Sequence, residues 1–310
     1  MNSSRNFRKW FAGLGLAAAF SGTPALANIS SEFSSDSSKD NFAITSCATS
    51  SSSLADVWTD STNAGTYRMC LTTPSKYEIT LYKVAICTAD PITGTAIDLS
   101  SCFIVFNSTG GTSVDLGNLD SPIPLTAPET RPDIGTYTNM FMLMGNSITL
   151  KGSYTTAAGT FNTQNNSNSH GGKWTHSSGL ASAQEFDHSF DKYGFDGTGC
   201  KATYQRTQSD GQIRAVITNN DSTNSTLTYQ TEESGGQCAG TITRVAGVWK
   251  PNTPLEITGQ TNGLELRFII SDGGIQIESE DDWHNSENRT YWKHPSWAYA
   301  GDFKPTFITY

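Results

Sequence analysis

Apolar residues at alternate positions are the feature that most constrains how this chain can fold. Side chains of a β-strand point to opposite faces in turn, so a period of two predicts strands rather than helices. The run YEITLYKVAIC shows this period on both faces. One face would carry Tyr77, Ile79, Leu81 and Ala85, and the other Tyr82, Val84 and Ile86. Two apolar faces predict a central strand that is covered from both sides.

Three of the five methionines, Met140, Met142 and Met144, stand at alternate positions of another predicted strand. They would line one face at a spacing of about 6.7 Å, whereas a Cu(I) ion needs several thioether sulfurs around one point. Methionine fills irregular gaps in cores well. We therefore favour a core position over a soft-metal site or a membrane or partner surface. The pair Gly145-Asn146 predicts a hairpin turn after this strand.

Further strand-like runs cover most of the chain. The run CFIVF predicts a short strand that ends at the turn signal NSTGG. The runs QIRAVIT and STLTYQ predict a hairpin across NND. The runs PLEIT, LELRFII and IQIESE predict a three-stranded meander, in which Leu264, Leu266, Phe268 and Ile270 share one face. The last residues, PTFITY, predict a closing strand.

One segment has helical periodicity instead. Its apolar residues recur three or four positions apart, at Leu180, Ala183, Phe186, Phe190 and Tyr193. A serine at 177 or 178 would cap this helix, and the glycine at 194 would end it. The predicted fold class is therefore all-β, a two-part β-sandwich architecture with one short helix.

The composition divides the chain into five segments. We expect a signal peptide over residues 1–27, a serine-rich flexible arm over 28–55, an N-terminal β-sandwich domain over 56–158, a polar linker or long loop over 159–179, and a C-terminal β-rich domain over 180–310. Eleven of the 26 residues from 28 to 53 are serine, so this arm is too polar to form its own core. It would be a spacer, or an arm that adds a strand at Phe42–Thr45 to a neighbouring subunit.

The first 27 residues have the three-part layout of a secretory signal peptide. A basic head with Arg5, Arg8 and Lys9 precedes an apolar stretch and the small residues Ala25 and Ala27. Cleavage would remove three positive charges and no negative one, so the formal net charge would change from −9 to −12. Such an acidic chain is a poor partner for nucleic acid, and no later segment is long and apolar enough to span a membrane. The predicted location is secreted or at the cell surface, with the periplasm as a further compartment.

Cysteine usage agrees with export. An even number of cysteines in an exported chain indicates disulfides. All six follow the expected cleavage site: Cys47, Cys70, Cys87, Cys102, Cys200 and Cys238. Of the 15 pairings that six cysteines allow, we expect each cysteine to pair with its neighbour. The firmest expectation is Cys87 with Cys102, since they flank a turn-rich segment, and closing such a loop would be worth about 3 kcal/mol.

Part of the chain resembles known surface proteins. The runs YEITLYKVAIC, LSSCFIVF and RPDIGTYTNMFMLM together resemble a layout seen in exported proteins of marine bacteria, most of which have no assigned activity. The entry GTYT into an apolar strand also resembles prealbumin-like and immunoglobulin-like surface modules. The resemblance covers residues 75–155, implies a β-sandwich and transfers no catalytic residue.

Three polar constellations are candidates for chemistry. The motif SHGGKW resembles the oxyanion loop of some lipases, but the sequence has no nucleophile elbow G-x-S-x-G. A second candidate would bind calcium or form a catalytic dyad, although we favour a solvated surface. It consists of Glu185, Asp187, His188, Asp191 and Asp196. The third, ESEDDWH at 278–284, could supply the two carboxylates of a glycosidase, but charge at a strand end usually protects a sheet edge.

Aromatic residues gather near the C-terminus. If these side chains are exposed, they would form a platform for sugar rings or a subunit contact. If they are buried, they would close the core of the C-terminal domain. We favour the buried arrangement. We retain as a candidate binding surface Trp283, Tyr291, Trp292 and Trp297.

These observations predict an exported, non-enzymatic structural or interaction protein of the cell surface, such as a matrix or fibre subunit. It would associate with itself or with another surface protein. One alternative is a carbohydrate-binding module that uses the C-terminal aromatics, and the other is a secreted glycoside hydrolase that uses the acidic clusters. No catalytic residue, cofactor or metal ion is assigned.

Overall fold

The structure is a computed structural model that describes part of the chain. The described residues are 29–30, 43–44, 47, 67–93, 96–117, 131–156, 159–166, 171–190, 203–208, 210–218, 226–228, 242–271, 273–280, 295, 297–301 and 303–310. They form strands β1 to β22 and no helix. Every pairing between these strands is antiparallel. The predicted all-β class is confirmed, while the expected signal peptide lies outside the described residues.

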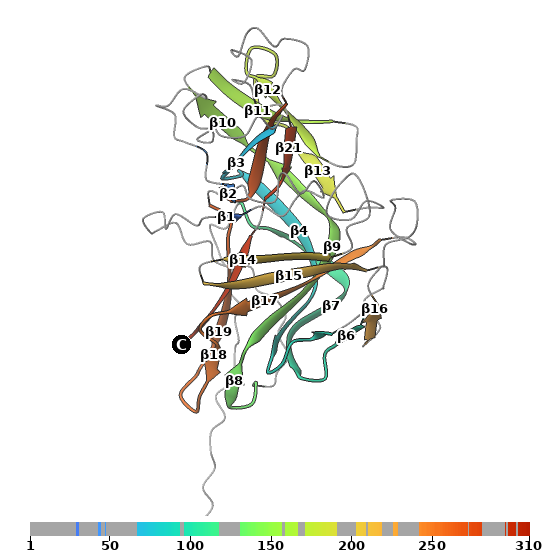
Figure 1. The fold of residues 1–310 in the computed structure, drawn as a ribbon, viewed down its shortest axis with the longest axis vertical. Coiled ribbons are helices and arrows are strands. Elements are labelled where there is room, and N and C mark those ends of the chain that lie inside the picture. The colour runs from blue at the N-terminus through green and yellow to red at the C-terminus, as the bar shows by residue number, and fades with distance from the viewer. Residues whose placement is uncertain are drawn as a thin grey trace, which may run out of the picture.

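The largest sheet has seven strands and lies in the middle of the molecule (Figure 1). Its order is β14-β15-β17-β9-β4-β7, and β13 also pairs with β9. The strands are β4 (Lys76–Cys87), β7 (Cys102–Asp115), β9 (Asn139–Lys151), β13 (Phe186–Ser189), β14 (Thr203–Gln208), β15 (Gly211–Thr218) and β17 (Arg244–Pro251). The ladder between β9 and β17 places strands of both expected domains in one sheet.

A six-stranded sheet forms the upper end of the molecule in Figure 1. Its order is β10-β11-β12-β21-β20-β3. The strands are β3 (Tyr67–Thr72), β10 (Ser153–Thr156), β11 (Gly159–Asn165), β12 (Gly172–His176), β20 (Ile275–Glu280) and β21 (Trp297–Ala300).

Four smaller sheets complete the fold. One has the order β16-β6-β5, and the others pair β1 with β2, β18 with β8, and β19 with β22. Their strands are β1 (Ile29–Ser30), β2 (Ala43–Ile44), β5 (Ile92–Thr93), β6 (Ala96–Asp98), β8 (Gly135–Tyr137), β16 (Thr226–Thr228), β18 (Leu255–Ile257), β19 (Leu264–Ile269) and β22 (Lys304–Thr309). The closing strand is confirmed as β22, and β2, within the arm, pairs with β1 of its own chain.

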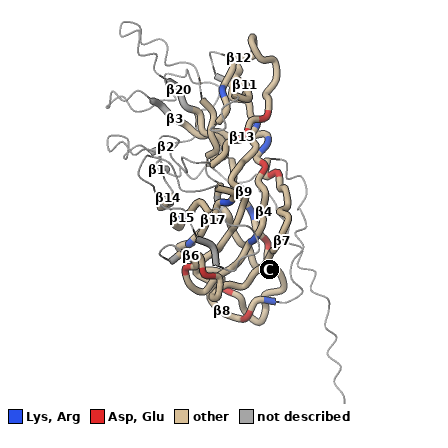
Figure 2. The backbone as a smooth tube through the Cα atoms, turned by 90° about the vertical axis from the view of Figure 1, so that its right-hand side faces the viewer, with Lys and Arg blue, Asp and Glu red and all other residues tan. Residues whose placement is uncertain are grey.

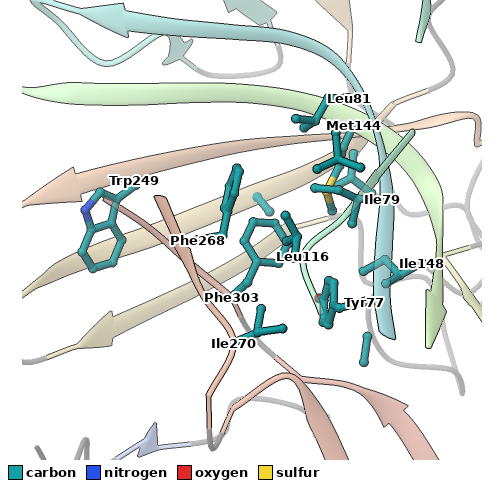
Figure 3. Close-up of a cluster of buried hydrophobic side chains, with 14 of the residues drawn as sticks. Tyr77, Ile79, Leu81, Leu116, Met144, Ile148, Trp249, Phe268, Ile270 and Phe303 are labelled. Carbon is teal, nitrogen blue, oxygen red and sulfur yellow. The ribbon is translucent and has the colours of Figure 1, made fainter. Parts of the chain in front are cut away.

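The main core packs one face of the seven-stranded sheet against the other sheets. Figure 3 shows Tyr77 and Met144 from this sheet facing Phe268 of β19 and Phe303. The ring of Phe303 lies 5.7 Å from that of Tyr77 and 5.5 Å from that of Phe268, both edge-on. The predicted apolar face of β19 is confirmed, since Leu264, Leu266, Phe268 and Ile270 are all buried.

The methionine strand belongs to this core, as predicted. Met140 is 8% exposed and Met144 is 6% exposed, and the half-buried Met142 packs against the same cluster. The opposite face of the sheet carries a second, smaller core, which includes Phe141 and Leu143. Both faces of β9 and β4 are therefore buried, and the predicted central position of β4 is confirmed.

A β-bulge corrects the predicted faces of β4. Leu81 and Lys83 pair with the adjacent residues Met144 and Leu143 of β9, so Tyr82 is one extra residue in β4 relative to β9. Because side chains alternate with a period of two, one inserted residue exchanges the faces of everything that follows. Val84 therefore packs in the main core beside Leu81, and Ala85 packs in the second core.

The two turns predicted within β7 and β9 are also bulges. Strand β9 runs through Gly145-Asn146 without a hairpin, and its register with β4 shifts there, between Ile79 and Leu81. Strand β7 runs through NSTGG in the same way, opposite Leu81 and Lys83 of β4. Gly111, with a φ of +78°, allows the irregularity in β7 because glycine adopts this backbone conformation without strain.

The predicted helix over residues 180–193 is wrong where the structure describes it. Residues 186–189 form β13, which pairs with β9, and residues 180–185 are not helical. Phe186 and Phe190 are both buried. A spacing of four residues places side chains on one face of a helix, but also on one face of a strand, so the pattern fits either structure.

Two predicted strand pairings are wrong as well. The runs expected to form a meander are β18, β19 and β20, which pair with β8, with β22, and with β3 and β21. The strand β16 pairs with β6 instead of β15. Turn signals show where a chain reverses, but which strand the next strand pairs with depends on residues that are distant in the sequence.

Two of the expected disulfides are confirmed. Cys47 bonds to Cys70, and Cys87 bonds to Cys102 across the paired ends of β4 and β7. The expected partners Cys200 and Cys238 lie outside the described residues.

Candidate functional site

The six-stranded sheet has two chemically different faces. Its inner face contributes Tyr154, Phe161, Trp174 and Ala298 to the main core. Directly paired residues of neighbouring strands share a face, and alternate residues along a strand lie on opposite faces. The register therefore places polar residues of β10, β11 and β12 on the outer face, namely Ser153, Thr155, Thr160, Asn162, Gln164, Lys173 and Thr175.

Side-chain hydrogen bonds link these outer residues into a polar ladder. Ser153 Oγ donates to Asn162 Oδ1 at 2.6 Å, and Thr175 Oγ1 donates to Gln164 Oε1 at 2.8 Å. Further along, the hydroxyl oxygens of the pair 155 and 160 lie 3.0 Å apart. The bonds fix the rotamers of these side chains, so the outer face presents ordered polar groups, apart from Asn162, which is buried.

The ladder leads to Trp297 on β21, the one member of the predicted aromatic surface that the structure describes. Lys173 pairs with Trp297 across the strands, and its Nζ lies 5.4 Å from the indole ring centroid. This distance is that of a cation–π contact. Trp297 is half-buried, and the other three predicted aromatics, Trp283, Tyr291 and Trp292, lie outside the described residues.

A polar groove lies beside β10, where the six-stranded sheet meets the seven-stranded one. Its volume is about 580 Å³. The lining combines five hydroxyls, one amide, one ammonium group and two methyl groups, from Ser75, Lys151, Ser153, Thr160, Asn162, Ser177, Ala181, Ser182 and Ala183. These residues come from four separate parts of the sequence, which explains why no sequence pattern predicted the groove. Its one local signal is the run of small residues SSGLASA.

Hydrogen bonds to the sheet hold one wall of the groove. Asn162, 3% exposed, donates from Nδ2 to the backbone oxygen of Leu180 at 2.7 Å. The fully buried Thr163 donates from Oγ1 to Gln184 O at 2.7 Å, and the Gln184 amide donates back to Thr163 O at 2.7 Å. The segment between Leu180 and Gln184 is thus anchored to β11 at both ends.

Two lysines at the groove differ in their partners. Lys76 and Lys151 are paired residues of β4 and β9. Lys76 Nζ lies 2.9 Å from Glu185 Oε2 and 3.1 Å from Glu78 Oε2. The hydrogen bond to Glu185, followed by the one to Glu78, raises the pKa of Lys76. Lys151 has no ion pair with any residue that the structure describes, so its ammonium group is the uncommitted charge of the groove.

The first predicted acidic cluster is dispersed among separate partners. Glu185 pairs with Lys76, and Asp187 Oδ1 accepts a hydrogen bond from Thr149 Oγ1 at 2.6 Å. His188 Nδ1 accepts from the amide of Ala300 at 2.8 Å. Asp191 and Asp196 lie outside the described residues, among which no group of three or more potential metal ligands occurs.

The structure describes only part of the other two constellations. Glu278 and Glu280 belong to β20, and the rest of that acidic run lies outside the described residues. In SHGGKW, a Cβ on Gly171 would meet Ala298 O at 2.6 Å, and a Cβ on Gly172 would meet the Phe186 ring at 2.5 Å. Close packing of β12 thus explains these two glycines.

No family model matches the chain, no curated protein matches it, and no solved structure matches its fold. Among the described residues, no helix is long and apolar enough to cross a membrane.

Proposed function

We propose that this chain is an exported, non-enzymatic structural or interaction protein of the cell surface, such as a matrix or fibre subunit. The observation that carries the proposal is the two-faced six-stranded sheet. Its inner face is packed into the core, while its outer face presents an ordered row of hydroxyl and amide groups that ends at Lys173 and Trp297. A rigid, polar face with an aromatic residue at its end suits contact with another molecule.

Export is supported by the disulfides and by the layout of the first 27 residues. Disulfides persist in oxidising compartments and are rare in the reducing cytosol. Two bridges, Cys47–Cys70 and Cys87–Cys102, fix the described part of the chain. The acidic net charge of −9 is typical of a soluble exported protein rather than a nucleic-acid binder. Figure 2 shows both signs of charge interspersed along the described tube.

Self-association is the mode of interaction that we propose, and β10 is its contact strand. β10 ends the six-stranded sheet and, among the described strands, pairs with β11 alone. An edge strand carries unpaired backbone groups that can extend the sheet into another molecule. The seven-stranded sheet ends at β14, which has β1 lying against it, and at β7. A second copy suits β10, because antiparallel pairing would set serine and threonine side chains opposite one another.

Size-exclusion chromatography with light scattering tests this role. The exported form, residues 28–310, should give a mass that rises with protein concentration. A single monomeric mass over the whole concentration range would overturn the proposed self-association.

Carbohydrate binding is a second candidate function, favoured by the indole of Trp297 beside the polar ladder. Sugar rings stack on aromatic faces, and their hydroxyls pair with groups that both donate and accept hydrogen bonds. Trp297→Ala should then abolish binding to a glycan array. Unfolding curves should show that the variant is still folded. Equal binding by the variant and the parent would exclude this use of Trp297.

A further inference from the structure

The groove beside β10 has the chemistry of a binding site for a sugar acid. We infer that it binds a carboxylate-bearing carbohydrate chain, with Lys151 as the partner of one carboxylate. The inference rests on the proposed role of the outer face as a contact surface. The groove lies at the β10 end of that face, and a sugar acid is its ligand class.

The lining selects a hydroxylated ligand. Serine and threonine hydroxyls both donate and accept hydrogen bonds, as sugar hydroxyls do. The hydroxyls of Ser177 and Ser182 form no hydrogen bond within the described residues, so they are available to a ligand. The only apolar residues in the lining are Ala181 and Ala183. A peptide ligand would need deeper apolar pockets for its side chains.

The charges around the groove select one carboxylate rather than a dense polyanion. Lys151 is uncommitted, whereas the neighbouring Lys76 is held by Glu185 and Glu78. Lys76 together with Glu185 and Glu78 has a net charge of −1, so Lys151 supplies the positive charge and a second anion close to it would be repelled. Phosphate groups and sulfate-rich chains are usually bound by several cations together. A single carboxylate fits a lone lysine better.

The polar ladder extends the site away from the groove. Ser153 and Asn162 line the groove and also belong to the ladder that reaches Lys173 and Trp297. Strands β10, β11, β12 and β21 lie side by side, so three strand spacings of about 4.8 Å, or about 14 Å, separate β10 from the strand of Trp297. A chain with its acid group at Lys151 could therefore lay a later ring against Trp297.

Calorimetric titration with a matched pair of probes tests the inference. The probes are a neutral hexasaccharide that carries a single terminal glucuronic acid, and the methyl ester of that acid, which keeps the rings but removes the charge. The exported protein should bind the acid at least tenfold more tightly than the ester. Lys151→Met should weaken binding of the acid at least tenfold and leave binding of the ester unchanged. Lys250→Met, at an exposed lysine of β17 outside the groove lining, should change neither.

The outcomes separate this inference from the proposed function. Equal binding of acid and ester, or full binding of the acid by Lys151→Met, would overturn it, as would absence of binding by either probe. Unfolding curves for both variants show whether each is folded before titration. Self-association is measured on the same samples, and Lys151→Met should assemble as the parent does. If the acid fails to bind while the parent still assembles, the groove is not a sugar-acid site, and the proposed self-association is unaffected.

Discussion

His188 and Ala300 join the two large sheets through one hydrogen bond. His188 lies on β13, which pairs with β9 of the seven-stranded sheet, and Ala300 lies on β21 of the six-stranded sheet. The Ala300 amide donates to His188 Nδ1 at 2.8 Å, so the neutral imidazole carries its proton on Nε2. The ring also lies 5.7 Å from that of Tyr299 and 5.0 Å from that of Phe190.

Removing this acceptor should weaken the junction between the sheets. His188→Ala leaves the Ala300 amide without its partner, and a buried donor left unsatisfied costs about 1–3 kcal/mol. We expect a loss of this size in the free energy of unfolding, measured by urea denaturation. His188→Asn keeps an acceptor near the position of Nδ1 and should lose less. Equal losses for the two variants would show that ring packing, rather than this hydrogen bond, stabilises the junction.

Much of the strand content could be predicted from the sequence, but strand partners could not. The period of two identified β4, β9, β19 and β22, because alternate residues of a strand lie on the same buried face and are therefore apolar. The bulge at Tyr82 places the later residues of β4 on the faces opposite to those predicted. Tyrosine is common in regular strands, so the sequence did not predict a bulge at this position. The spacing of Phe186 and Phe190 fits a helix and a strand equally, and only the pairing with β9 decides between them.

The candidate site shows the same limit. Trp297 was a candidate because aromatics cluster near it in the sequence. Its contact with Lys173 depends on the ladder between β12 and β21, strands more than a hundred residues apart. The groove depends on the ends of β4 and β9 meeting the segment after β12, so its members share no local pattern.

The bulge in β7 should depend on Gly111. Its φ is +78°, and a Cβ at this position would lie 2.5 Å from Thr80 Cγ2 and 2.9 Å from the Tyr82 ring. The same ring holds Arg244, whose Cζ lies 3.6 Å from the ring centroid. Left-handed strain alone would cost Gly111→Ala about 1–2 kcal/mol. Because the Cβ also clashes with Thr80 and Tyr82, we expect a larger loss in the free energy of unfolding, measured by thermal and urea denaturation.

Gly110 is the matched control for that substitution. A Cβ on Gly110 would meet no atom within 4 Å, and its φ lies outside the left-handed region. Gly110→Ala should therefore leave the unfolding free energy nearly unchanged. Equal effects at the two glycines would contradict the packing described for Gly111.

The methionine strand should respond according to burial. Met144→Ala should cost about 2–4 kcal/mol in unfolding free energy, because it leaves a cavity in the main core. Met142 is only half-buried, so Met142→Ala should cost less. Titration with Cu(I) should show no tight stoichiometric binding. A submicromolar copper site that is lost in either variant would contradict the core assignment.

Lys83 should make stability depend on pH in the alkaline range. Burial lowers the pKa of Lys83 from its usual 10.5, so the unfolded chain holds this proton to higher pH than the folded one. The cost of the buried charge is present below the folded pKa and disappears as pH rises to 10.5. Lys83→Met should therefore be more stable than the parent near pH 7, and this advantage should shrink toward pH 10.5. An advantage that stays constant with pH would contradict the burial of this charge.

Electron microscopy of the exported form is the most direct test of the central claim, that the protein acts by self-association through its six-stranded sheet. The parent should form ordered assemblies at high concentration. Thr155→Lys places a charge on the edge strand β10 and should leave single particles, while Thr207→Lys on β14 should assemble as the parent does. Single particles of the parent at every concentration, or unchanged assemblies of Thr155→Lys, would contradict the account.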